Sequence, residues 1–115
     1  MHNHTFGLLA EYLVIIKYFF TGYLPLKHRW KSNAGEIDLI LKRYRTIIFC
    51  EVKARRSNFT QAENYVTETQ KRRLTRAAEH FLALNPRLHA KNVRFDLAIV
   101  RSCFNIKIFR GWIGW

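Results

Sequence analysis

The sequence predicts one α/β domain over residues 1–115, with elements in the order α-β-β-β-α-β and a further short strand near the end of the chain. Three observations support this class. An apolar segment of helical length comes first, two short apolar runs then fold back on each other, and a later segment repeats apolar residues at helical spacing. A chain of 115 residues can bury one core but not two.

The first helix is expected between Phe6 and Phe20. This segment has 15 residues and contains Glu11 and Lys17, whereas a membrane-spanning helix needs about 20 mostly apolar residues. A signal peptide is not indicated either, because no Lys or Arg precedes the apolar stretch and no small-residue cleavage site follows it. We therefore expect a buried helix, no membrane partner and a cytoplasmic location, with Gly22 ending the helix as a C′ glycine.

A strand and a hairpin are expected next. Residues 23–30 read as a strand, which Pro25 restricts to a sheet edge or a strand start. Residues 36–42 and 46–53 form the hairpin, with the turn centred between Tyr44 and Arg45. In a symmetric antiparallel pairing about that centre, the numbers of paired residues sum to 89.

A second helix begins after a polar loop. Thr67 and Gln70 fit a capping box, in which Thr67 caps the helix and Gln70 reaches back. Apolar residues then follow at helical spacing, and the helix is expected to end near Asn85-Pro86. These apolar residues are Leu74, Ala77, Ala78, Phe81 and Leu82. A strand over residues 93–100 and an amphipathic tail over residues 105–115 complete the chain.

The hairpin places two carboxylates on one face. In the register that sums to 89, Asp38 lies opposite Glu51, and directly opposed residues have Cβ atoms about 4.5–5.5 Å apart. Their oxygens could therefore converge on one hard divalent cation. Lys53 points to the same side by the period of two, and a metal with an adjacent ammonium is typical of phosphodiester-cleaving sites. The alternative is a salt-bridge ladder, because the same register places Glu36 opposite Lys53.

The charge of the chain indicates a polyanionic partner. It has 20 Lys and Arg against 8 Asp and Glu, a formal net charge of +12 and a sequence pI near 10.3. A basic surface for nucleic acid is expected from six residues: Arg55, Arg56, Lys71, Arg72, Arg73 and Arg76. The alternative is an ordinary solvated helix face, which the scarcity of nearby acids disfavours. Gln70 is expected to face the sheet and reach the polar side of the hairpin, or to serve only as a helix cap.

Glu11 stands inside the apolar first helix. A buried and unpaired acid there would cost several kcal/mol, so we expect pairing with a metal or with a cation. The alternative is an acid at the helix edge bonded to Arg or Lys. The two cysteines, Cys50 and Cys103, lack metal or disulfide spacing and suit a reducing compartment, with Cys50 in the core.

Six segments of the chain follow a known pattern. They are Gly7-Leu8-Leu9-Ala10-Glu11, Gly22-Tyr23, Gly35-Glu36-Ile37-Asp38-Leu39-Ile40, Phe49-Cys50-Glu51-Val52-Lys53-Ala54-Arg55, Lys71-Arg72-Arg73-Leu74 with Ala77-Ala78, and Arg94-Phe95-Asp96. Together they resemble the small bacterial YraN-like family. That family is predicted to belong to the PD-(D/E)XK nuclease superfamily and is similar in fold to archaeal Holliday-junction resolvases.

The resemblance implies a restriction-endonuclease-like fold, a mixed β-sheet flanked by helices with the hairpin at its centre. It assigns the Mg²⁺ or Mn²⁺ ligands to Asp38 and Glu51, with Glu11 as the helical glutamate of the site. Lys53 would assist the attacking water or stabilise charge. Gln70 or Lys71 would supply a further polar residue from the second helix.

Three details depart from the family pattern. Lys31 stands where arginine is frequent, Val14 stands where a small residue is frequent, and the turn at Tyr44-Arg45 lacks the usual glycine. The site residues themselves are intact.

The function expected from the sequence is metal-dependent hydrolysis of DNA phosphodiester bonds, with branched and single-stranded DNA among the candidate substrates. The alternative is a nucleic-acid-binding protein that keeps the nuclease fold without turnover. A third reading, a small ribosome-associated basic protein, predicts no binding of divalent metal. A homodimer is compatible with each of these functions.

Overall fold

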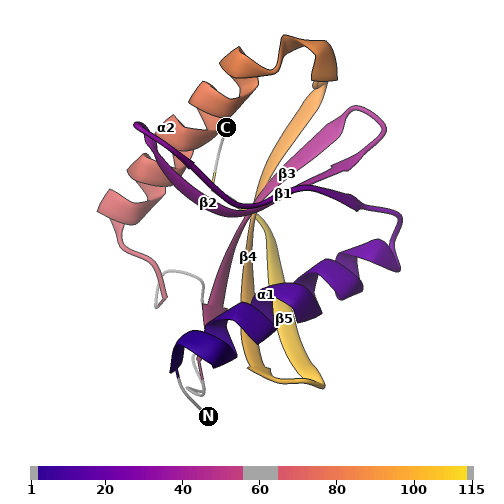
Figure 1. Cartoon of the computed structure of the whole chain (residues 1–115), viewed down its shortest axis with the longest axis vertical. Helices are drawn as coiled ribbons and strands as arrows, with labels where there is room; N and C mark the ends of the chain where they lie inside the picture. The colour runs from indigo at the N-terminus through magenta and orange to yellow at the C-terminus, as the bar shows by residue number, and fades with distance from the viewer. Residues whose placement is uncertain (1–2, 56–64, 114–115) are drawn as a thin grey trace.

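A five-stranded mixed sheet lies between two helices in the computed structural model, which describes residues 3–55 and 65–113 (Figure 1). The elements are α1 (Asn3–Phe19), β1 (Leu24–Ser32), β2 (Gly35–Arg43), β3 (Thr46–Ala54), α2 (Glu68–Leu84), the 3₁₀ turn η2 (Pro86–Leu88), β4 (Asn92–Ser102) and β5 (Asn105–Ile113). The predicted α/β class and the order of the elements are confirmed.

The strands are arranged in the order β1-β2-β3-β4-β5. Neighbouring strands are antiparallel except β3 and β4, which run parallel and are connected through α2. A parallel pair needs such a crossover because a short turn cannot return the chain to the same end of the sheet. Pro25 lies in the edge strand β1, as predicted, where its missing N–H leaves no central ladder position unpaired.

Helix α1 covers one face of the sheet. It buries Ala10, Val14 and Tyr18, which recur every four residues and pack on apolar side chains of β2, β3 and β4. The helix ends as predicted at Gly22, whose φ of 88° suits glycine. Hydrogen bonds from Gly22 N–H to the Phe19 carbonyl and from Tyr23 N–H to the Tyr18 carbonyl complete a Schellman cap. Within residues 3–55 and 65–113, no helix combines the length and the apolarity that crossing a bilayer requires.

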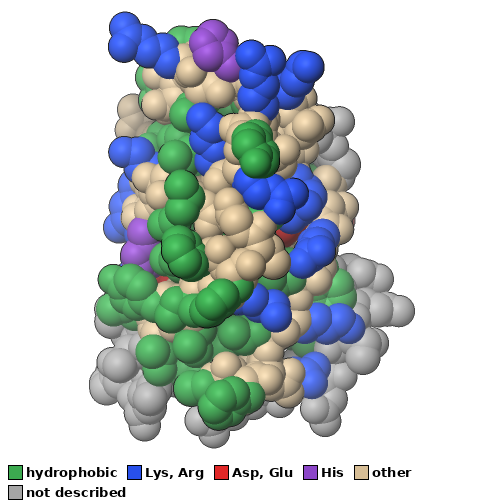
Figure 2. Space-filling model, turned by 90° about the vertical axis from the view of Figure 1, so that its right-hand side faces the viewer, with side chains coloured by type: hydrophobic (Ala, Val, Ile, Leu, Met, Phe, Trp, Pro, Cys, Tyr) green, Lys and Arg blue, Asp and Glu red, His purple; other side chains and the backbone are tan. Residues whose placement is uncertain are grey.

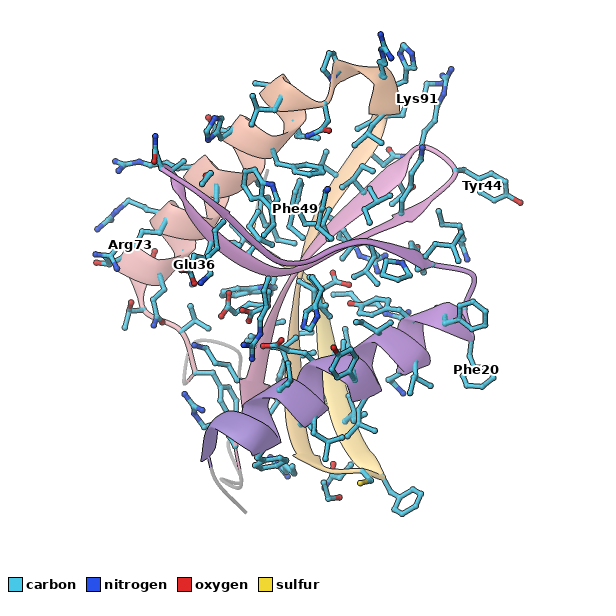
Figure 3. The ribbon with its side chains drawn as sticks, viewed as in Figure 1. Phe20, Glu36, Tyr44, Phe49, Arg73 and Lys91 are labelled. Carbon is cyan, nitrogen blue, oxygen red and sulfur yellow. The ribbon has the colours of Figure 1, made fainter. Side chains whose placement is uncertain are left out.

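Helix α2 covers the opposite face. The predicted capping box is present at Thr67 and Gln70, and the buried residues Leu74, Ala77, Ala78 and Phe81 match the predicted apolar spacing. Phe49 of β3 points toward this helix (Figure 3) and packs edge-on against Phe81 with ring centroids 5.9 Å apart. Because side chains alternate along a strand, Cys50 faces α1 and is fully buried, as predicted.

The C-terminal end forms more structure than expected. The tail is a nine-residue strand, β5, paired with β4 over most of its length. The hairpin turn also forms without glycine, because Tyr44 adopts the left-handed conformation with φ 54°. At the other end of the hairpin, Gly35 has φ 142°, and a Cβ there would lie 3.4 Å from the carbonyl oxygen of Arg73. Glycine thus lets the start of β2 approach α2 closely.

Asp96 accepts hydrogen bonds from residues of three elements, α1, β4 and β5. It is fully buried on β4 and accepts two hydrogen bonds from the guanidinium of Arg94, at 2.8 and 2.9 Å. The hydroxyl of Tyr18 on α1 and the N–H of Gly111 on β5 donate to the same carboxylate. A buried charge is tolerated when it is paired and its lone pairs are filled, so Asp96 has a structural role.

Candidate active site

The candidate site forms where β2 and β3 diverge. Residues from Arg43 to Leu39 pair with residues from Thr46 to Cys50, and every pair sums to 89 as predicted. The ladder ends at Leu39 and Cys50, so the predicted direct pairing of Asp38 with Glu51, the next residues on the two strands, is not formed. The Oδ2 of Asp38 accepts a hydrogen bond of 2.8 Å from the N–H of Val52, so the side chain takes the place of a strand carbonyl.

Asp38 and Glu51 form a half-buried carboxylate pair. Burial first, and the nearby charge of Asp38 second, raise the pKa of Glu51 to about 8. Burial also raises the pKa of Asp38, which the hydrogen bonds from Val52 and from protonated Glu51 oppose. The raised pKa of Glu51 favours its protonated form at neutral pH, and in that form its hydroxyl can donate to Asp38.

Lys53 lies beside this pair. Its Nζ is 3.6 Å from Glu51 Oε1, and only 17% of its side chain is exposed. The alternative ladder between Glu36 and Lys53 is not formed, because Glu36 lies 3.8 Å from Lys31 on the neighbouring edge strand, where both side chains are exposed. The lysine thus contacts the carboxylate pair, as the same-face prediction requires.

Glu11 is buried and held by two basic residues of β1. Its Oε1 lies 2.6 Å from His28 Nε2 and accepts a hydrogen bond of 2.8 Å from Arg29 Nε. Consecutive strand residues normally point to opposite faces. Arg29 has φ 56°, in the left-handed region, and this break lets both side chains reach Glu11. The sequence left pairing with a metal and pairing with a basic residue open for Glu11, and in the structure Glu11 pairs with Arg29 and His28.

His28 and Arg29 were not identified from the sequence. The pattern of β1 alternates, and nothing in it indicates a left-handed residue. Only Glu11 itself pointed to them. A buried acid needs a cationic partner, but the sequence does not indicate where in the chain that partner lies.

A cavity of about 450 Å³ gathers these groups. Its polar lining consists of Glu11, Asp38, Glu51, Lys53 and Arg55, and the first turns of α1 close one side through Phe6 and Gly7. Over the described ranges, no three His, Cys, Asp or Glu side chains come together as a ready metal cluster. Asp38 and Glu51 still fit Mg²⁺, because this ion keeps several waters and is often held by one or two carboxylates together with substrate phosphate.

Gln70 has two neighbours that matter for the site. Its Oε1 accepts a hydrogen bond of 2.9 Å from Thr67 N–H, so the capping role is present. It also lines a second cavity of about 350 Å³ together with Glu51 and Arg73. Glu51 therefore separates the carboxylate cavity from one bordered by the N-terminal half of α2.

The predicted basic surface is largely exposed. Arg72, Arg73 and Arg76 are exposed on α2, and Arg55 is exposed at the rim of the carboxylate cavity. Lys71 differs, since its Nζ lies 3.0 Å from Glu68 and over the ring of Trp112. Arg56 lies outside the described residues. Figure 3 shows Arg73 and Glu36 on the same side of the molecule, at the left of the view, and Lys91 at the upper right.

Comparison with known proteins identifies the family. Residues 10–100 match the uncharacterised protein family UPF0102. The chain belongs to this family. It is 38% identical over 102 residues to a UPF0102 protein of Roseobacter denitrificans, covering 89% of this chain and 78% of the relative. A UPF0102 protein of Ruegeria pomeroyi is 36% identical over 112 residues, which are 97% of this chain and 90% of the relative. One from Methylorubrum extorquens is 39% identical over 98 residues, or 85% and 76% of the two chains.

UPF0102 is the family that the sequence motifs resemble under the name YraN-like, so that prediction is confirmed. The match includes both carboxylates, Lys53 and the basic half of α2. The description of the family carries no activity, and the roles of these residues therefore remain predictions.

Proposed function

We propose that this UPF0102 protein is a metal-dependent endonuclease that hydrolyses phosphodiester bonds in DNA. The observation that carries the proposal is the half-buried pair of Asp38 and Glu51 with Lys53 beside it, in one cavity. Two carboxylates that burial and mutual repulsion hold partly protonated are poorly suited to a purely structural role. They are well suited to exchange a proton for a cation.

Asp38 and Glu51 would hold Mg²⁺ or Mn²⁺, which would polarise the phosphoryl oxygen and lower the pKa of a bound water. Asp38 is oriented for this by the N–H of Val52. Lys53 is held by burial and by Glu51, so its ammonium is placed to stabilise charge on the attacking water or on the phosphoryl group. Glu11 orients Arg29 at the edge of the site, which makes it a positioning residue.

DNA would approach over the basic residues beside the cavity. Arg55 stands at the rim of this cavity, and Arg73 lines the neighbouring cavity that shares Glu51. Arg72 and Arg76 are exposed on the same helix as Arg73. Contacts of this type neutralise phosphates without reading bases, so binding depends on salt and little on sequence. Branched and single-stranded DNA are the substrates to be compared with linear duplex.

The alternative is a nucleic-acid-binding protein without turnover. It is favoured by one observation: the acids already have partners, with Lys53 beside Glu51 and two basic residues on Glu11. A binder of this kind would keep the basic surface and would not need a metal.

A cleavage assay separates the two functions. Purified protein is incubated with Mg²⁺ or Mn²⁺ and with linear, single-stranded, flapped and four-way DNA. Lys53→Ala should keep metal binding and reduce cleavage by about 10²–10³, the usual effect of removing one preorganised electrostatic group. Asp38→Ala should lose metal binding and cleavage together. Lys91→Ala serves as a matched control, because Lys91 is exposed at the far end of the molecule.

Two results would contradict the enzyme. Cleavage that persists in both site variants would show a contaminating nuclease or a different site. Metal binding to the wild type with no cleavage of any substrate would favour the non-catalytic binder.

A further inference from the structure

The outer face of α1 carries an unusual apolar stripe. Of the described residues, nine large hydrophobic side chains are exposed, and five of these belong to α1 or directly follow it: Leu9, Tyr12, Ile16, Phe19 and Phe20. The first four recur at i, i+3, i+7 and i+10, so they share one face of the helix. That face is opposite the buried side formed by Ala10, Val14 and Tyr18. We call these five exposed residues the α1 stripe.

The stripe differs in charge from the rest of the surface. Figure 2 shows hydrophobic side chains gathered in the lower half of one face, at the height of α1, with Lys and Arg more frequent above and to the right. Between Leu9 and Phe20 the only charged residues are Glu11, which is buried and paired, and Lys17. Two copies of a chain with net charge +12 repel each other, so a neutral face is where they can approach.

We propose that the α1 stripe is the contact between two copies of this chain, with the two α1 helices packed antiparallel across a twofold axis. An isologous contact must be complementary to itself. When the helices are aligned so that paired numbers sum to 28, Tyr12 of one copy faces Ile16 of the other. The same alignment places Leu9 opposite Phe19. Each aromatic ring thus meets an aliphatic side chain of the second copy.

The exposed area of the α1 stripe supplies a large part of such a contact. The five side chains are between 37% and 82% exposed, which corresponds to roughly 500 Å² of accessible side-chain surface per copy, given about 150–250 Å² for each aromatic residue. A standard stable interface buries about 800 Å² per partner. The stripe therefore supplies more than half of the requirement, and the half-buried flanks at Leu13 and Ile15 adjoin it.

A lipid surface fits the stripe less well. Helices that lie on membranes have a polar face rich in Lys and Arg opposite the apolar one. In α1 the opposite face is Ala10, Val14 and Tyr18, packed on the sheet. Phe20 points away from the body of the protein (Figure 3) and is 82% exposed.

The dimer has a consequence that rests on the proposed function. The N-terminal turns of α1 line the carboxylate cavity through Phe6, Gly7 and Glu11. Packing α1 against its twofold copy would hold two cavities at a fixed separation. Two fixed sites suit a substrate with two symmetry-related strands, such as branched DNA.

The oligomeric state tests the contact without any cleavage assay. Sedimentation equilibrium of the full chain, free of DNA and at about 100 µM, should give a dimer. Ile16→Glu buries an unpaired charge in the contact and should weaken dimerisation at least about 100-fold. Leu84→Glu is the matched control, because Leu84 is a similarly exposed aliphatic residue on α2, and this variant should remain dimeric. Added salt should strengthen the dimer by screening repulsion.

A crosslink tests the alignment. In a Cys103→Ser background, which removes the exposed native thiol and leaves the buried Cys50, chains with Tyr12→Cys are mixed with chains with Ile16→Cys. Mild oxidation should give mainly the mixed disulfide. A majority of Tyr12→Cys homodimers would overturn the alignment.

Three results would overturn the dimer itself. These are a monomeric wild type at about 100 µM, an Ile16→Glu variant that remains as dimeric as the control, and a monomer that sediments with anionic lipid vesicles through the stripe. Because none of these readouts uses cleavage, failure of the dimer and failure of the nuclease proposal are distinguishable.

Discussion

Replacing Glu51 with glutamine should change how the stability of the metal-free protein depends on pH. Burial and the charge of Asp38 raise the pKa of Glu51 to about 8 in the folded protein, against an ordinary value of 4.5. Between these values the unfolded chain has lost the proton and the folded chain still holds it. The free energy of unfolding of the wild type should therefore fall as pH rises through this window, by about 1.4 kcal/mol per pH unit. Below pH 4.5 this contribution is fully present, and above pH 8 it is lost.

The structure sets the size of the effect. The full shift corresponds to about 5 kcal/mol. This is an upper bound, because water entering the cavity would reduce the cost of the ionised pair. Glutamine can donate to Asp38 as the protonated glutamate does and cannot ionise. Glu51→Gln should therefore match the wild type near pH 4.5 and be more stable by several kcal/mol near pH 9.

Urea denaturation in EDTA at about pH 5, 7 and 9 measures this difference. Glu36→Gln is the matched control, because Glu36 is an exposed acid on β2, two residues from Asp38. Its effect on stability should vary little with pH. If Glu51→Gln followed the wild type in parallel at all three pH values, the carboxylates would not form a desolvated pair and the reasoning would be refuted. Adding Mn²⁺ at about 100 times its Kd should stabilise the wild type by about 2.7 kcal/mol, with release of a proton.

Two further changes test the DNA surface and the buried carboxylate of β4. Replacing Arg72 and Arg76 with alanine should weaken binding to duplex DNA and flatten the logarithmic salt slope by up to about two units, whereas the double change of Arg87 and Lys91, with the same loss of charge elsewhere, should leave the slope intact. An unchanged slope in the first variant would place the interface elsewhere. Asp96→Ala should lower the free energy of unfolding by about 3–5 kcal/mol in urea, because it leaves a paired guanidinium without its partner; a loss under about 1 kcal/mol would contradict the structural role of Asp96.

Local rules predicted much of the fold and the centre of the site. The register of the hairpin followed from its turn centre, because a period of two fixes which residues share a face. The capping box at Thr67 and the glycine at Gly22 marked helix ends through contacts within a few residues. The neighbourhood of Asp38, Glu51 and Lys53 depends only on this hairpin, so it could be reached from the sequence.

Longer-range features could not be reached in this way. The partners of Glu11 depend on a left-handed residue at Arg29, and the partners of Asp96 lie on α1, β4 and β5. No local rule relates such distant positions. The exposed apolar face of α1 could not be predicted for a different reason. The sequence shows a helix that is apolar all round, and only the packing shows which side lacks a partner.

The half-buried carboxylate pair favours a ligand because the empty site destabilises the fold. Burial and the charge of Asp38 raise the pKa of Glu51, and the nearby lysine, with its Nζ at 3.6 Å, does not restore the ordinary value. Apolar residues of similar volume would often be neutral or stabilising in such a place. Functional sites commonly lower the stability of a fold. Binding of the ligand then restores the free energy of unfolding that the empty site lacks. A divalent cation followed by a DNA phosphate is a sequence of ligands that fits both the acids in the cavity and the arginines beside it.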